Sequence, residues 1–106
     1  MTAGAVADAR ARFLAEVVSR IQKVKRYPAE ARRKNVKGTS KVEFALSARG
    51  EVLSVRLVSS SEHPLLDGES LDMIRRAGPY PRIPEEIGLA RIELVLPVEF
   101  ELKAGR

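Results

Sequence analysis

The chain contains no cysteine and a single histidine, His63, among its 106 residues. Without cysteine there are no disulfide bonds and no thiol catalysis, and one histidine argues against a histidine-based metal cluster or a Ser/His catalytic pair. The sequence also lacks a glycine-rich phosphate loop, and no partner acid is placed beside the pair Glu85 and Glu86. We therefore expect no metal, no cofactor and no enzymatic activity.

Long hydrophobic runs are absent as well. No apolar stretch approaches the roughly 18 residues that indicate a transmembrane helix, and the N-terminal MTAGAVADAR lacks the basic-then-apolar order of a signal peptide. With 44% hydrophobic residues, the chain suits one compact domain over residues 1–106, with its core at about 13–103. A second domain does not fit this length.

Charge is present but unevenly distributed, with a net value of +5. Residues 1–38 carry ten Lys or Arg and three Asp or Glu, whereas residues 61–88 carry three and six. The basic N-terminal region is either a solvated helix face or a surface that meets nucleic acid, acidic lipid or an acidic protein.

Three helices are predicted from the spacing of apolar residues and from proline. Apolar residues that recur every three or four positions indicate a first helix. It should end near Arg26, because the residue before a proline leaves the α region and Pro28 can open a second helix. A third helix has Asp67 near its start, where we expect it to act as the N-cap. The second and third helices are expected at 28–34 and 63–78.

Three strands are predicted from alternating apolar residues, over 39–48, 51–59 and 90–103. The first two form a hairpin, and Leu53, Val55 and Leu57 of the second should face the core. The order α-α-β-β-α-β predicts an α+β fold of two layers, with the helices on one face of a three-stranded antiparallel sheet. The simplest connections put the first strand in the centre and the last strand at an edge.

The last strand carries Pro97 in its middle. Proline has no N–H for the ladder, so it is tolerated on an edge strand whose nitrogen points away from the neighbouring strand. Backbone groups alternate between the two sides of a strand, so an unbulged strand would direct those of Val95, Glu99 and Glu101 outward. Such an edge is either protected by its own glutamates or accepts an extended peptide as an added strand.

Several segments occur together in a specific order: RYPAEARRKNVKGTSKVEFALSARGEVLSVRLVSSS, then LLDGESLDMIRRAGPYPRIP, then LVLPVEF. Their shared features are Tyr-Pro before a short Ala/Arg helix, glycine at a hairpin turn, Pro-Tyr-Pro after a helix, and proline inside the final strand. Over about residues 13–103 this combination resembles the C-terminal domain of the energy transducer TonB. Arg26 stands where that family commonly has glutamine, and Ser61 where glycine often follows the serine pair.

The resemblance implies a periplasmic domain that transmits the proton-motive force from the ExbB–ExbD motor to outer-membrane transporters. The full-length protein would be anchored in the inner membrane through an N-terminal part and a proline-rich spacer that this sequence does not contain. The transporters present an extended segment, the TonB box, which pairs with the last strand. A TolA-like force adaptor and a small basic nucleic-acid binder are the alternatives, but Phe44 and Phe100 fall on buried faces, where they cannot stack on bases.

The residues expected to bind a partner lie in two groups, the Tyr-Pro region and the last strand. Tyr27 and Pro28 are equally well explained as the bend between two helices. The resemblance favours pairing on the C-terminal side of Pro97, and the same edge is open to a second copy of the chain, which would give a homodimer. The expected binding residues are Arg26, Tyr27, Pro28, Arg32, Val95, Pro97, Val98, Glu99, Phe100, Glu101 and Leu102.

Overall fold

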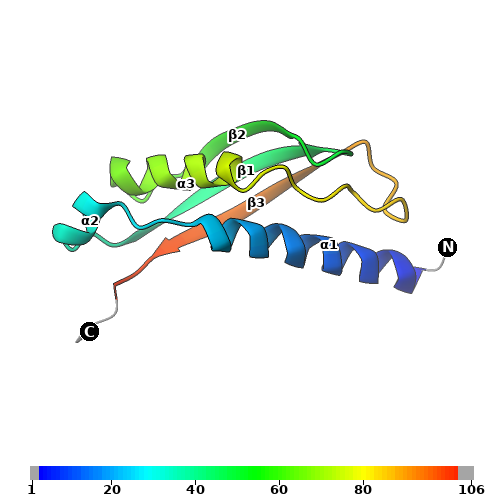
Figure 1. The fold of residues 1–106 in the computed structure, drawn as a ribbon, viewed down its shortest axis with the longest axis horizontal. Coiled ribbons are helices and arrows are strands. Elements are labelled where there is room, and N and C mark those ends of the chain that lie inside the picture. The colour runs from blue at the N-terminus through cyan, green and yellow to red at the C-terminus, as the bar shows by residue number, and fades with distance from the viewer. Residues whose placement is uncertain (1–2, 103–106) are drawn as a thin grey trace.

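A computed structural model describes residues 3–102 and confirms the expected α+β fold in the expected order. Its sheet is antiparallel with the strand order β2-β1-β3, so the last strand is an edge strand. The helices lie on one face of this sheet (Figure 1). The elements are α1 (Ala3–Val24), α2 (Ala29–Arg33), β1 (Gly38–Ser47), β2 (Val52–Ser59), α3 (Pro64–Arg76) and β3 (Arg91–Phe100).

The core lies between the helices and the inner face of the sheet. Ile21 of α1, Phe44 of β1, Met73 of α3 and Phe100 of β3 are all almost completely buried. Burial of each such side chain contributes about 1.5–3 kcal/mol relative to exposure. The even residues of β3 face this core and the odd ones face solvent, as the alternation predicted.

Of the three β2 residues expected to face the core, Val55 and Leu57 pack against it, but Leu53 does not. Leu53 was expected to point inward from β2, but it is 50% exposed, and Val52 packs against the core instead. The cause is a register shift between Ala45 and Leu46 of β1, which pairs Leu46 with Val52. A bulge of this kind places an extra residue in one strand and exchanges inward and outward positions beyond it.

The turn between β1 and β2 is braced by the segment that follows α3. Gly50 has a positive φ of 89°, and its N–H donates to the Ser47 carbonyl at 2.9 Å. The N–H of Tyr80 donates to the Gly50 carbonyl at 3.0 Å, and that of Ile83 to the Ala48 carbonyl at 2.9 Å. The Pro-Tyr-Pro segment is therefore attached to the end of the hairpin, and Tyr80 is buried against Phe44.

Asp67 does not cap α3, contrary to the sequence prediction. The N-cap position is occupied by His63, and Asp67 lies inside the helix. Its carboxylate accepts hydrogen bonds from the hydroxyls of Ser40 (2.8 Å), Ser60 (2.5 Å) and Ser61 (2.8 Å), and from the Ser61 N–H (2.8 Å). The side chain thereby joins α3 to β1 and to the end of β2. Burial alone would raise the Asp67 pKa, but these hydrogen bonds outweigh it and lower the pKa to about 2.

Replacing Asp67 by asparagine should lower the free energy of unfolding by about 1–3 kcal/mol at neutral pH, because donors that now bond a carboxylate lose charge-assisted partners. The pKa is depressed in the folded state, so this stabilisation is present above about pH 4 and is lost as the pH falls toward 2. Urea unfolding of the parent and of Asp67→Asn between pH 7 and pH 2 measures this stabilisation. The matched control is Asp72→Asn at an exposed position of the same helix. A difference between Asp67→Asn and the parent that stays constant down to pH 2 would contradict the assignment.

Candidate functional site

The open edge of β3 is the first component of the site. The N–H of Ala48 donates to the carbonyl of Ala90 at 2.8 Å, toward β1, whereas the carbonyl of Glu99 accepts from the Lys25 ammonium on the other side. From Ala90 through β3, the even-numbered residues therefore direct their backbone groups to β1, and the odd-numbered residues direct theirs to the open edge. The pairing of β3 with β1 runs without a register shift from Arg91 to Phe100.

Pro97 fits this geometry. It is an odd residue opposite Lys41, so its nitrogen faces the open edge and the ladder to β1 loses no donor. The prediction that Pro97 marks an unbulged edge strand is confirmed. The outward row of donors is consequently interrupted at one position, between Val95 and Glu99.

Aromatic and cationic groups gather where β3 ends. The Tyr27 ring packs edge-on against Phe100, with ring centroids 5.5 Å apart, and the Tyr27 hydroxyl donates to the Val36 carbonyl. The Lys25 ammonium lies 5.0 Å from the centre of the Phe100 ring, and the Arg32 guanidinium 5.5 Å from that of Tyr27. The two groups of residues that the sequence suggested thus meet at one end of the molecule.

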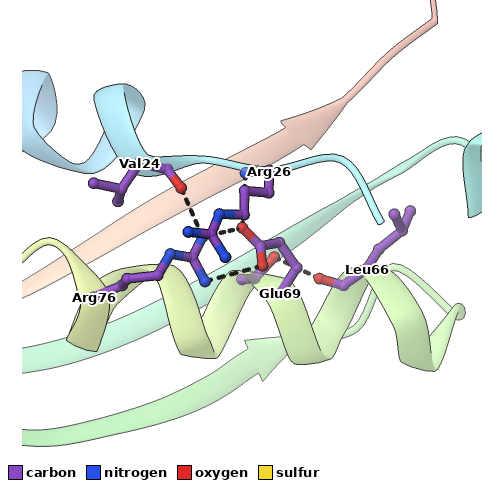
Figure 2. Close-up of polar contacts among 6 residues, drawn as sticks. Val24, Arg26, Leu66, Glu69 and Arg76 are labelled. Atoms are coloured by element: carbon purple, nitrogen blue, oxygen red, sulfur yellow. Dashed lines mark hydrogen bonds and ion pairs between the residues drawn. The ribbon is translucent and has the colours of Figure 1, made fainter. Parts of the chain in front are cut away.

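The segment between α1 and α2 is held by α3 (Figure 2). The Arg76 guanidinium donates to both oxygens of Glu69, at 3.3 and 2.5 Å, and to the Val24 carbonyl at 2.6 Å. Glu69 also accepts the backbone N–H of Arg26 at 2.8 Å. We name these four residues the Arg76 clamp. It fixes the chain immediately before Tyr27, and so positions that ring against Phe100.

An apolar groove lies between α1 and the middle of β3. It encloses a cavity of about 210 Å³, with Phe44 among its walls. Val18 of α1 and Val95 of β3 remain 38% and 54% exposed, which leaves apolar surface beside the free edge. The residues of the two elements that line this α1–β3 groove are Leu14, Val17, Val18, Leu94, Val95 and Leu96.

Most of the expected binding residues lie at or near this edge, but the strand is shorter than predicted. Glu101 and Leu102 follow the end of β3, and Lys103, the predicted last residue of the strand, lies outside the described residues. Arg26 is exposed, and it contacts Glu69 through its backbone N–H rather than through its side chain.

The sequence alone did not identify Lys25 or the groove residues of α1 as part of the site. The only available signal was the repeat of Leu14 and Val18 one turn apart beside the buried stripe.

The described residues hold no group of three or more His, Asp or Glu side chains suited to a metal ion. Within the same part of the chain, no helix has the length and apolar character needed to cross a membrane.

Comparison with known proteins agrees with the fold and the motifs. A family model described as the Gram-negative bacterial TonB protein C-terminal matches residues 23–102. Protein TonB of Pseudomonas putida is 38% identical over 86 residues, covering 80% of this chain and 35% of the relative. Protein TonB of Helicobacter pylori is 29% identical over 91 residues, covering 86% and 30%. The chain thus spans about a third of the length of these curated relatives.

Solved structures show the same likeness. The NMR structure of the TonB C-terminal domain of Helicobacter pylori has a TM-score of 0.74 at 26% identity, covering 96% of this chain and 98% of that one. The structure of the HasB C-terminal domain has a TM-score of 0.55 at 38% identity, covering 89% and 73%.

Proposed function

Because this chain belongs to the TonB C-terminal domain family, we propose that it is the receptor-binding domain of a TonB-like energy transducer. In this proposal the domain works in the periplasm and binds the TonB box of an outer-membrane transporter. Residues 1–106 act as one domain, and a part of the full-length protein outside this sequence anchors it in the inner membrane and contacts ExbB–ExbD. Force generated from the proton-motive force would reach the transporter through this domain.

One observation carries the proposal: β3 is an unbulged edge strand whose odd-numbered backbone groups face away from β1. An extended peptide can satisfy these groups by joining the sheet as a fourth strand, a mode in which main-chain bonds supply affinity and side-chain contacts supply selectivity. The expected binding residues of the Tyr-Pro region adjoin the same edge through the contact of Tyr27 with Phe100. A second copy of the chain would compete for this edge.

The proposal predicts micromolar affinity for a synthetic TonB-box peptide from a transporter of the same organism, and only weak, salt-sensitive binding to DNA or RNA. Titration calorimetry measures both, and amide chemical shifts locate the peptide. Shifts should concentrate in β3 and leave β2, the opposite edge, unchanged. Tight nucleic-acid binding at physiological salt without a peptide signal would refute the proposal, and shifts confined to Val52–Ser59 would refute the choice of edge.

A further inference from the structure

The structure favours one half of the β3 edge over the other. Building on the proposed function, we propose that the docked segment pairs with β3 before Pro97, around Glu93 and Val95. In the same register it inserts one aliphatic side chain into the α1–β3 groove. This register differs from the pairing after Pro97 that the family resemblance implied.

The backbone supplies the first reason. Arg91, Glu93 and Val95 are odd residues before Pro97, and each directs both an N–H and a C=O toward the open edge. After this run, Pro97 has no donor, and the carbonyl of Glu99 already accepts from the Lys25 ammonium. Pairing at that end would have to displace the Lys25 ammonium, which also lies over the Phe100 ring, from this carbonyl. An uninterrupted ladder is available only before Pro97.

The direction of side chains supplies the second reason. A residue placed opposite Val95 in an added strand shares the face of Val95 and points to solvent, so its neighbours along the peptide point to the helix side. These neighbours lie in register with Leu94 and Leu96, which line the α1–β3 groove. The side chain of one neighbour would enter the groove and cover the exposed part of Val18.

The chemistry of the occupant follows from the neighbouring residues of α1. Arg10, Leu14 and Val18 recur at helical spacing on one side of α1, which runs along β3 in the same direction (Figure 1), and Lys25 follows directly after the end of the helix. Leu14 and Val18 are one turn apart, about 6 Å, close to the length of two strand residues. The cations on either side, Arg10 and Lys25, form no ion pair with any carboxylate in the described part of the chain. The groove therefore suits an extended segment with an aliphatic centre and acidic residues flanking it.

Two proline variants compare the halves of the edge. Val95→Pro and Glu99→Pro each remove one outward N–H and leave the bonds to β1 intact, because both residues are odd. With a synthetic TonB-box peptide in calorimetry, Val95→Pro should weaken binding about three- to tenfold, the size of one main-chain bond, and Glu99→Pro less than twofold. The opposite ranking would overturn this register but keep edge docking. Normal binding by both variants would refute edge docking itself.

A second pair of variants tests the groove without touching the backbone of β3. Val18→Asp places a charge in the groove and should weaken the same peptide about tenfold or more. Val58→Asp changes a valine of similar exposure on the opposite edge strand, 44% against 38% for Val18, and should have no effect. A peptide whose helix-facing aliphatic residue is replaced by serine should bind weakly to the parent and lose little more with Val18→Asp. Equal losses for both peptides would show that no side chain enters the groove. Circular dichroism confirms that each variant is folded.

Discussion

Replacing Gly50 by alanine should destabilise the domain by about 3–5 kcal/mol, the largest effect we expect from a single substitution. A Cβ built on Gly50 would lie 2.0 Å from the carbonyl oxygen of Tyr80 and 2.9 Å from that of Pro81. Both are backbone atoms, so no change of side-chain rotamer can relieve the contact. The φ of 89° adds strain for any residue with a Cβ.

Relief of this clash requires the segment after α3 to move away from the hairpin. That movement would break the hydrogen bonds from Tyr80 to Gly50 and from Ile83 to Ala48, and would withdraw the Tyr80 ring from Phe44. The Tyr80 hydroxyl would also lose its bond to the Ile74 carbonyl, now 2.6 Å long inside the core. Loss of several coupled contacts, rather than a single bond, accounts for the expected size.

Urea unfolding of Gly50→Ala beside Gly88→Ala separates the clash from the backbone strain. Gly88 also has a positive φ, of 69°, but the nearest atom to its added Cβ is 3.8 Å away. Gly88→Ala should therefore cost only about 1–2 kcal/mol, the penalty of the left-handed conformation. Equal losses in the two variants would mean that the loop yields easily and that the contact with Tyr80 contributes little.

The edge position of β3 could be predicted from the sequence because its evidence is local. Alternation from Ala90 onward defines the buried face, and Pro97 restricts which side of the strand can face a neighbour. Both are properties of consecutive residues and do not depend on distant packing. The same holds for the bend at Tyr27 and Pro28, since proline limits the conformation of the residue before it.

Other features depended on contacts between distant segments and could not be predicted. The bulge beside Ala45 exchanges the positions of Val52 and Leu53, and no pattern within β2 alone reveals it. Aspartate is a residue type that favours N-cap positions, but Asp67 lies inside α3. Its carboxylate instead accepts hydrogen bonds from serines of β1 and of the segment that follows β2. The contact of Lys25 with Glu99 joins residues 74 positions apart. The sequence alone therefore could not show that Lys25 occupies a backbone carbonyl of the β3 edge after Pro97.

Replacing Arg76 by methionine should lower the free energy of unfolding by about 2–4 kcal/mol. The Glu69 side chain is only 10% exposed and that of Arg76 26%, so loss of the guanidinium leaves a poorly solvated carboxylate that still accepts the Arg26 N–H. The Val24 carbonyl loses its donor at the same time. Removing one member of a buried charge pair costs more than the pair itself contributes, because the other charge remains.

The double variant Arg76→Met with Glu69→Met distinguishes this cause from simple loss of packing. Without the carboxylate there is no uncompensated charge, so the double variant should be more stable than Arg76→Met alone, despite one further substitution. Lys34→Met provides the surface control, because Lys34 and its partner Glu30 are 64% and 48% exposed, and this change should cost under about 0.5 kcal/mol. If the double variant is instead less stable than the single one, the Arg76 clamp acts through its hydrogen bonds and packing, and charge compensation is not its main contribution.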